Sequence, residues 1–216
     1  MPVLKVALTG GIACGKSVVA AYLKKKGCYL HRADQVAHRL MQPEKPAWKE
    51  IVNHFGRHIL NLDQTINRQR LGEIVFTNRR EREWLNRLLH PMVLKKKEAA
   101  WRRLARTNKD RIFISEAALT IEAGLASFFD KIIVVYCPKK IQVQRLMARS
   151  NLSRKEAEKR VKAQWPTVKK LKYADYVIDT SGTIEETLAQ AEKVYQQLCA
   201  DLEAKKGEES SFQTGS

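Results

Sequence analysis

The sequence lacks the features that define several classes of protein. Its four cysteines are scattered, and no two of them have the spacing of a metal-binding pair. We therefore expect free thiols in a reducing compartment. No apolar run approaches the roughly 20 residues that cross a bilayer, and the N-terminal stretch lacks the pattern of a cleaved leader. These absences predict a cytoplasmic protein with no membrane partner.

Acidic residues are scarce relative to basic ones. The chain has 23 Asp and Glu against 40 Lys and Arg, a formal net charge of +17. Such an excess fits a nucleic-acid partner, a site that concentrates polyanionic small molecules, or a solvated basic face. No aromatic-rich stacking segment and no zinc-finger spacing is present. A nucleic-acid partner is therefore the less favoured interpretation.

The chain has no internal repeat, and its 216 residues suit one domain with room for an inserted lobe. Short apolar runs alternate with longer helical patterns, which is typical of a parallel sheet wrapped by helices. The runs "RIFISEAAL" and "KIIVVYC" are almost continuously apolar, as in strands buried on both faces. The other expected strands are "VLKVALT", "CYLHRAD" and "YVIDTSG".

The helical segments divide the expected single domain, residues 1–204, into parts. A long helical stretch over about 35–108 predicts a lobe that binds a substrate, and Pro91 is expected to kink or split its longest run. Two basic helices within about 139–172 predict a lid, the second capped by Ser153 with Glu156 three residues later. After a last helix over about 183–204, the polar tail 205–216 is expected to be disordered.

The segment "GGIACGKS" directly after the first expected strand matches a phosphate-binding loop. Gly10, Gly15, Lys16 and Ser17 fit the pattern of a Gly, four free positions and Gly-Lys-Ser. Glycines let the backbone N–H groups surround a polyphosphate, and the helix that follows points its positive end at the same place. Lys16 can reach the β- and γ-phosphates, and the Ser17 hydroxyl can bind Mg²⁺. The sequence therefore predicts ATP with Mg²⁺.

The residues expected to contact the nucleotide are Gly11, Ile12, Ala13, Cys14, Gly15, Lys16, Ser17 and Val18. Cys14 occupies a free position of the pattern, where its backbone N–H matters more than its thiol. The helix N-terminus and the neighbouring lysine are expected to lower the pKa of that thiol. We therefore expect Cys14 to be alkylated faster than the other thiols and to be protected by ATP.

Asp34 follows the second expected strand. Ligands of open α/β sheets lie beyond the carboxyl ends of the strands, so Asp34 and the phosphate loop can face one crevice. A small-molecule kinase needs a carboxylate that orients or deprotonates the attacking hydroxyl. Asp34 is the best placed candidate, although the same residue could simply cap the helix that follows.

The ordered motifs of the chain resemble those of the dephospho-coenzyme A kinase family. They are "LTGGIACGKS", "RADQVAH", "FGRHIL" with Asn67-Arg68 and "VF", His90-Pro91, "EAALTIEAGL", "QVQRLMAR", "KRVKAQ" and "ADYVIDTSG". The loop alone is generic, but this ordered set is specific to one family. The resemblance implies a three-layer P-loop NTPase-type parallel sheet with an inserted helical substrate lobe and a short helical lid.

The resemblance also implies the reaction and its residues. ATP would phosphorylate the ribose 3′-hydroxyl of dephospho-coenzyme A, with Asp34 as the base. Lys16 and Arg145 would stabilise charge on the transferring phosphoryl group, and Arg149 would close over ATP. The acceptor side would be formed by Thr9, Asp34, His90 and Glu122.

Several positions depart from the family's pattern. Arg32 stands where the family usually has a first Asp, so the base role falls on Asp34 alone; Ala13 and Thr180 replace a Gly and an Asn. Two other functions stay open at this point. One is a P-loop kinase for another small acceptor, such as a nucleoside monophosphate, and the other is a basic P-loop protein that binds nucleic acid.

Overall fold

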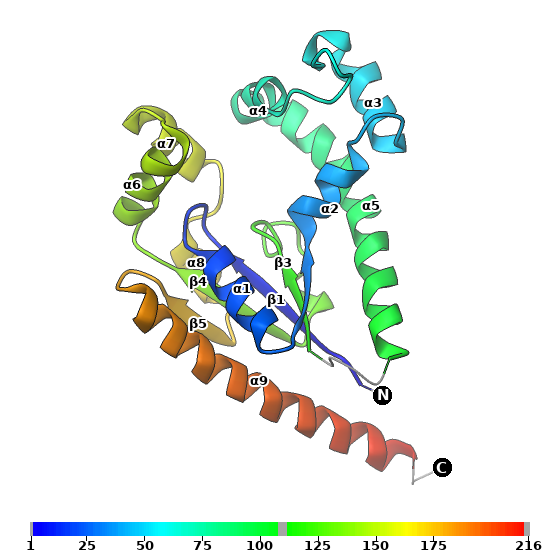
Figure 1. The fold of residues 1–216 in the computed structure, drawn as a ribbon, viewed down its shortest axis with the longest axis vertical. Helices are drawn as coiled ribbons and strands as arrows, with labels where there is room; N and C mark the ends of the chain where they lie inside the picture. The colour runs from blue at the N-terminus through cyan, green and yellow to red at the C-terminus, as the bar shows by residue number, and fades with distance from the viewer. Residues whose placement is uncertain (1, 108–111, 214–216) are drawn as a thin grey trace. The chain divides into compact units, whose positions relative to one another are not determined.

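The computed structural model describes residues 2–107 and 112–213, with side chains as far as residue 208. The described chain forms two compact units, residues 1–31 with 100–216 and residues 32–99. The first unit contains a five-stranded sheet of β1 (Leu4–Gly10), β2 (Tyr29–Arg32), β3 (Ile112–Glu116), β4 (Lys131–Tyr136) and β5 (Tyr176–Asp179) (Figure 1). All five expected strands are therefore confirmed.

The strand order β2-β3-β1-β4-β5 places β1 at the centre of the sheet. β1 is parallel to both neighbours, with Leu8 opposite Glu116 on β3 and Gly10 opposite Val135 on β4. β4 and β5 are also parallel. The carboxyl ends of β1, β3 and β4 therefore lie together, and the loops that follow them share one edge of the sheet.

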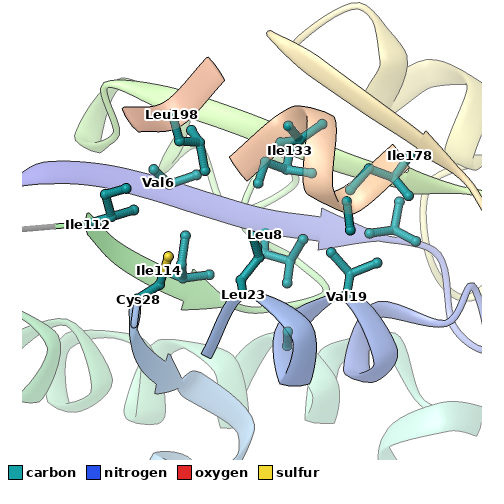
Figure 2. Packing of buried hydrophobic residues seen from close by; sticks show 14 of the residues in the cluster. Val6, Leu8, Val19, Leu23, Cys28, Ile112, Ile114, Ile133, Ile178 and Leu198 are labelled. Carbon is teal, nitrogen blue, oxygen red and sulfur yellow. The ribbon is translucent and has the colours of Figure 1, made fainter. Parts of the chain in front are cut away.

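The main core lies between one face of the sheet and two helices, α1 (Lys16–Lys25) and α9 (Ile184–Gln213). Alternate residues of β1, including Val6 and Leu8, point into this layer because successive strand residues face opposite sides. Figure 2 shows them packed with Leu23 of α1 and Leu198 of α9. This packing holds β1 and α1, and thereby the loop that joins them, in fixed positions.

The opposite face of the sheet buries a smaller cluster. Ala7 of β1 and Val134 of β4 pack there with Ile121 and with Leu171 of the short helix α8 (Thr167–Leu171). The sheet thus has helical or loop layers on both faces. This explains why β1, β3 and β4 are almost uniformly apolar.

Two basic helices follow β4, as the sequence predicted. They are α6 (Lys139–Ser150) and α7 (Arg154–Lys162). The expected capping box of α7 is confirmed: the Glu156 N–H donates to the Ser153 hydroxyl, and the Ser153 N–H donates to the Glu156 carboxylate. α8, which follows them, was not predicted.

The second unit is helical. It contains α2 (Ala33–Leu40), α3 (Pro46–Phe55), the 3₁₀ turn Arg57–Ile59, α4 (Arg68–Thr77) and most of α5 (Arg79–Ala105). Its own core is formed by Ile51, Ile59, Leu60, Ile66 and Leu71. The unit agrees with the predicted helical lobe over about 35–108, although residue 108 itself lies outside the described residues.

Pro91 does not split the helix that contains it. α5 continues from Arg79 to Ala105 with Pro91 inside. A proline in a helix removes one backbone hydrogen bond and crowds the preceding turn. The remaining hydrogen bonds and the packing of a 27-residue helix outweigh this local loss.

The C-terminal helix also extends further than the sequence predicted. α9 ends at Gln213 rather than near residue 204, so the part of the expected disordered tail up to Gln213 is helical, and residues 214–216 lie outside the described residues. The Lys205 ammonium explains part of the extension, because it pairs with Asp130 at 2.7 Å and donates to the Val3 carbonyl. No helix in the described part of the chain is both long enough and apolar enough to cross a membrane.

Candidate active site

The phosphate loop joins the end of β1 to the start of α1. Gly15 precedes α1 with φ of 75°, and Ala13 has φ of 58°, so both lie in the left-handed region. Glycine adopts this region without strain, whereas the Ala13 Cβ makes it costlier. Ala13, which stands where the family usually has glycine, therefore has a backbone conformation that favours glycine.

Gly11 is the loop residue that packs closely against Gln142 and Thr167. A Cβ at this position would come within 2.4 Å of Gln142 Nε2 and 2.5 Å of Thr167 Oγ1. Both atoms belong to buried side chains that hydrogen-bond one another at 2.7 Å. The second glycine of "GGIACGKS" is therefore required by packing, and Gln142 and Thr167 support the loop from below.

Lys16 lies at the start of α1, beside the loop. Its ammonium donates to the Gly10 carbonyl at 3.1 Å and to the Gly11 carbonyl at 2.8 Å. These bonds keep the charge next to the N-terminal end of α1, where the helix dipole also attracts anions. An ammonium has three N–H donors, so the position suits a phosphate contact.

The Ser17 hydroxyl fits the predicted magnesium ligand. Its side chain is exposed in the first turn of α1. No cluster of three or more His, Cys, Asp or Glu side chains suited to a metal occurs among the described residues. Magnesium bound with nucleotides takes most of its ligands from phosphates and water, so a single exposed hydroxyl beside the loop is the expected protein contribution.

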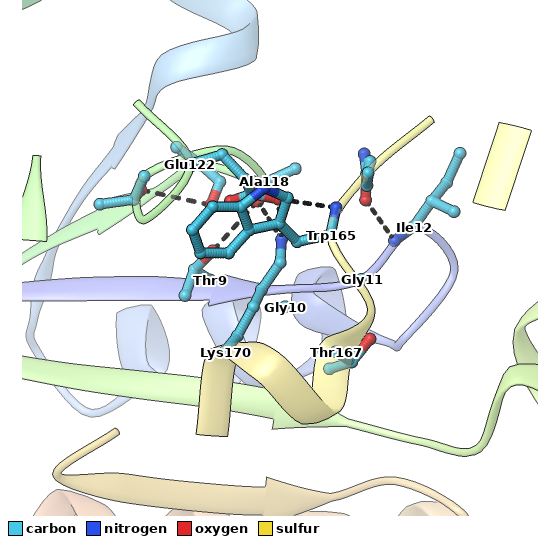
Figure 3. Close-up of polar contacts among 12 residues, drawn as sticks. Thr9, Gly10, Gly11, Ile12, Ala118, Glu122, Trp165, Thr167 and Lys170 are labelled. Atoms are coloured by element: carbon cyan, nitrogen blue, oxygen red, sulfur yellow. Dashed lines mark hydrogen bonds and ion pairs between the residues drawn. The ribbon is translucent and has the colours of Figure 1, made fainter. Parts of the chain in front are cut away.

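Helices α6 and α7 pack directly on the loop. Ile12 and Ala13 lie against Val143, Leu146 and Ala157 of α6 and α7. In addition, the Ile12 N–H donates to Gln164 Oε1 at 2.9 Å (Figure 3). The Ile12 N–H, which was expected to contact phosphate, is therefore hydrogen-bonded to Gln164 in the segment that follows α7.

Arg145 of α6 is joined to the loop through Thr180. Its guanidinium donates to the Thr180 hydroxyl at 3.1 Å and to the Thr180 carbonyl at 2.6 Å. The Thr180 hydroxyl in turn donates to the Cys14 carbonyl at 3.0 Å. Arg149 lies one turn beyond Arg145 on α6 and is exposed, so the two cations share a helix face.

A buried ion pair lies next to the loop, as Figure 3 shows. Lys170 of α8 is fully buried and contacts Glu122 Oε1 at 2.7 Å. The same ammonium donates to the Ala118 carbonyl at 2.7 Å, and the Thr9 hydroxyl donates to that carbonyl at 3.2 Å. The two predicted acceptor-side residues, Thr9 and Glu122, therefore belong to one network centred on Lys170, a residue that the sequence analysis did not single out.

Glu122 keeps one oxygen unused within this network. The Trp165 N–H donates to Oε1 at 3.3 Å, alongside Lys170. Oε2 is buried and has no hydrogen-bond partner among the described residues. A buried acceptor without a partner is costly, and a donor supplied by a bound molecule would relieve that cost.

The Lys170 pair gives a stability prediction. Removing one partner of a buried pair leaves an uncompensated charge, so Lys170→Met should lower the free energy of unfolding by about 3 to 5 kcal/mol. Urea unfolding followed by circular dichroism measures this change. Lys169→Met, at the exposed neighbouring position, is the matched control and should differ little from wild type. A Lys170→Met protein as stable as the control would contradict the role of the pair.

The remaining predicted residues lie in the helical unit. Asp34 is in the first turn of α2, so it neither ends the second strand nor caps the helix. The N-cap position belongs to Arg32, whose side chain makes no capping hydrogen bond. His90 lies within α5 and is half-buried, and burial lowers the pKa of its imidazole. A neutral imidazole at physiological pH can both donate and accept a hydrogen bond.

The helical unit also contains a cavity of 530 Å³, within the usual range for small-molecule sites. Its lining combines apolar side chains with hydrogen-bonding and cationic ones. The latter include His38, Gln42, Asn61, Asn67 and Arg68. His38 belongs to the family motif "RADQVAH" and Asn67-Arg68 to another, whereas Gln42 and Asn61 had no sequence signal and join the lining through folding.

The structure buries the Cys14 thiol, whereas the sequence predicted a thiol that is alkylated quickly. Its side chain is fully buried, as is that of Cys137, whereas Cys199 is half-exposed. The expected lowering of the Cys14 pKa is confirmed, to about 6, mainly by a hydrogen bond from the Cys137 thiol and further by the charge of Lys16, against the effect of burial. Burial nevertheless overturns the expectation of fast alkylation.

Thiol labelling should follow exposure. With iodoacetamide and the native protein, Cys199 should react at least about tenfold faster than Cys14, because buried thiols are inert to such reagents. Peptide mass spectrometry over a time course measures the four rates. Unfolded protein, in which all four thiols should react, is the control. Labelling of Cys14 ahead of Cys199 would contradict the buried position.

Strand β1 lies at the centre of a parallel sheet and ends in the phosphate loop, with Lys16 at the start of α1 and Arg145 on α6. This combination defines a P-loop kinase of the α/β class. Comparison with known proteins narrows the class. Residues 4–186 match the sequence pattern of the family described as "Dephospho-CoA kinase". The chain therefore belongs to the dephospho-CoA kinase family, and the sequence-based resemblance is confirmed.

Individual relatives agree with this assignment. The chain is 41% identical to a dephospho-CoA kinase of Syntrophus aciditrophicus, covering 98% of this chain and 91% of the relative. It is 39% identical to one of Aquifex aeolicus, over 91% and 98%. A solved dephospho-CoA kinase of Campylobacter jejuni matches with a TM-score of 0.65 and 30% identity, covering 90% of this chain and 96% of that one.

Proposed function

We propose that this protein transfers the γ-phosphoryl group of ATP to the ribose 3′-hydroxyl of dephospho-coenzyme A, the last step of coenzyme A synthesis. The observation that carries the proposal is the family match over residues 4–186. This range includes the phosphate loop, both lid helices and the last strand. The basic composition suits a site for two polyanionic substrates.

The loop residues would hold the polyphosphate of ATP. Backbone N–H groups of the loop and the N-terminal end of α1 would face the phosphate oxygens, and the Ile12 N–H would exchange Gln164 for a phosphate oxygen. Bound Mg²⁺, held by Ser17 together with the phosphates, would neutralise charge on the nucleotide. The Lys16 ammonium would turn from the Gly10 and Gly11 carbonyls toward the transferring group.

Two arginines of α6 would complete the electrostatic part of the site. Arg145 uses two of its five N–H donors on Thr180, which would fix its guanidinium while other donors contact phosphate. Arg149, exposed one turn away, would close over ATP. Positioned charges of this kind supply most of the catalysis in phosphoryl transfer.

Asp34 would accept the proton of the attacking 3′-hydroxyl. Its carboxylate lies in the first turn of α2. His90 and the cavity of the helical unit would bind the acceptor. Thr9 and Glu122, whose Oε2 has no hydrogen-bond partner among the described residues, would also contact the acceptor. A cytoplasmic location is also part of this proposal.

An acceptor panel tests the proposal. ATP and Mg²⁺ are supplied with dephospho-coenzyme A, with each nucleoside monophosphate, or with no acceptor, and ADP release is measured. Release that depends on dephospho-coenzyme A supports the proposal. Faster release with a nucleoside monophosphate would instead assign the protein to that acceptor. Salt-sensitive binding of random duplex DNA at useful affinity would favour the nucleic-acid alternative.

A further inference from the structure

The phosphate loop carries one thiol that faces another across the core. Cys14 belongs to the loop, and Cys137 directly follows β4. Both side chains are buried, with exposed fractions of 0% and 1%. The two sulfur atoms are 3.5 Å apart, and the Cys137 thiol donates to Cys14 Sγ. The residues are 123 positions apart in sequence, so only the fold brings them together.

The surroundings of Cys14 favour its ionised form. Gln142 Nε2 donates to Cys14 Sγ at 2.9 Å, and the Lys16 charge is close by. The pKa of Cys14 is lowered to about 6, and the largest cause is the hydrogen bond from Cys137. A thiolate is the nucleophilic form of cysteine. The phosphate loop therefore carries a nucleophilic thiolate, Cys14, next to the second thiol, Cys137.

We propose that Cys14 and Cys137 form an oxidative modification site, in which hydrogen peroxide converts the two thiols into an intramolecular disulfide. A cavity lies on the Cys137 side of this pair and can hold a small oxidant. This cavity of 230 Å³ is lined by Gly11, Cys137 and Gln142, among other residues. Hydrogen peroxide is far smaller than this volume, whereas larger thiol reagents are excluded by the burial of both sulfurs.

The reaction has two steps. The Cys14 thiolate attacks one oxygen of hydrogen peroxide, the O–O bond breaks, and Cys14 sulfenic acid and hydroxide are formed. The Cys137 sulfur then attacks the sulfenic sulfur, the S–S bond forms, the S–O bond breaks and water leaves. The thiol proton of Cys137 leaves with the sulfenic oxygen as that water, and the hydroxide of the first step takes up the proton that Cys14 released to solvent when it ionised. In total two thiols lose two electrons, and one peroxide yields two waters.

The change at Cys14 also activates Cys137. The pKa of the Cys137 thiol is raised, first by its hydrogen bond to Cys14, then by burial and by the Cys14 charge. Oxidation to sulfenic acid removes that charge. The neighbouring Arg145 cation, which lowers the Cys137 pKa, then faces no competing thiolate. The first step therefore prepares the second thiol for attack.

The disulfide would move the loop. Its sulfurs must approach from 3.5 Å to about 2.05 Å. The displaced Cys14 carries a carbonyl that is bonded to Thr180, and its thiol loses the hydrogen bond from Gln142. At Gly11 the loop packs closely on Gln142, where a Cβ would lie 2.4 Å from Gln142 Nε2. A shift of this size at a phosphate site should lower turnover about 100-fold; this consequence rests on the proposed function, whereas disulfide formation does not.

Peptide mapping tests the modification. The reduced full-length protein is treated with graded hydrogen peroxide, remaining thiols are blocked under denaturing conditions, and linked peptides are identified by mass spectrometry. The expected product links Cys14 to Cys137 and disappears with dithiothreitol. Cys199→Ser should give the same link. Absence of this link at peroxide levels that oxidise Cys199 would overturn the proposal.

Two further variants identify the order of events. Cys137→Ser and Cys137→Ala remove the second thiol, so Cys14 should accumulate as sulfenic acid, which dimedone traps when the oxidised protein is unfolded in its presence. Two different replacements guard against a folding defect, which thermal unfolding of each reduced variant reveals. Dimedone adducts on other cysteines but not on Cys14 would contradict the assignment of Cys14 as the attacking thiol.

Activity measurements separate this proposal from the kinase proposal. The linked wild-type and Cys199→Ser proteins should lose about 100-fold of the activity of their own reduced samples and regain it with dithiothreitol. Full activity of a sample in which mass spectrometry shows the link would refute the effect on the loop. Inactivity of the reduced protein with every acceptor would count against the kinase proposal alone, since the link is scored by mass.

Discussion

Lys16→Ala is expected to lower turnover by about 100- to 1000-fold, the usual effect of removing one preorganised charge that stabilises a transition state. In the proposed reaction, Lys16 serves both nucleotide binding and the transferring phosphoryl group. The variant should therefore also bind ATP more weakly. Steady-state kinetics of ADP release and titration with a fluorescent ATP analogue measure the two effects separately.

Lys24→Ala is the matched control for this variant. Lys24 lies on the same helix, is exposed and carries the same charge. Its replacement alters the net charge equally, so a general electrostatic effect would appear in both proteins. Equal and small losses in Lys16→Ala and Lys24→Ala would show that Lys16 has no specific role in the loop.

Asp34→Asn is expected to reduce turnover by about 100- to 10,000-fold, the range of a general base. Asparagine keeps the size of the side chain but cannot accept the hydroxyl proton. Because Asp34 is outside the phosphate loop, ATP affinity should change little. A fall in kcat with an unchanged dissociation constant for ATP is the expected pattern.

Glu50→Gln provides the control for Asp34→Asn. Glu50 is an exposed carboxylate on α3 of the same helical unit, and its neutralisation should leave kcat within about twofold of wild type, as for other exposed surface positions. Turnover near the wild-type value in Asp34→Asn would refute the base assignment. It would direct attention to other groups of the helical unit, His90 first.

The parts of the structure that sequence predicted depend on local patterns. β1 and the phosphate loop were predictable because an apolar run, a glycine pattern and a helix start follow one another without interruption. The cap of α7 was predictable because Ser153 and Glu156 satisfy each other within one turn. Such features depend on residues only a few positions apart, which is the range over which periodicity and capping act.

The parts that sequence did not predict depend on distant residues or on summed small effects. Lys170 and Glu122 are 48 positions apart, and neither carries a signal that it will be buried with the other. The helix containing Pro91 stays continuous because the sum of many backbone bonds exceeds one local cost. Gln142 belongs to a family motif, but the sequence does not show that its side chain packs against Gly11. In the structure a Cβ at Gly11 would lie 2.4 Å from Gln142 Nε2.

Thr180 illustrates how a departure from the family pattern acquires a physical meaning. As a sequence feature it was only a replaced Asn. In the structure its hydroxyl donates to the Cys14 and Tyr136 carbonyls, while its carbonyl and hydroxyl accept from Arg145. Thr180 therefore joins the phosphate loop to α6, the helix that carries Arg145.

The most direct test of the account is the identity of the reaction product. The protein is incubated with Mg²⁺, dephospho-coenzyme A and ATP labelled in its γ-phosphate, and the product is isolated and its phosphate position determined by phosphorus NMR. In the proposed reaction the label appears on the ribose 3′-oxygen, and one ADP forms per labelled coenzyme A. ATP consumption without labelled coenzyme A, or label at another position, would contradict it.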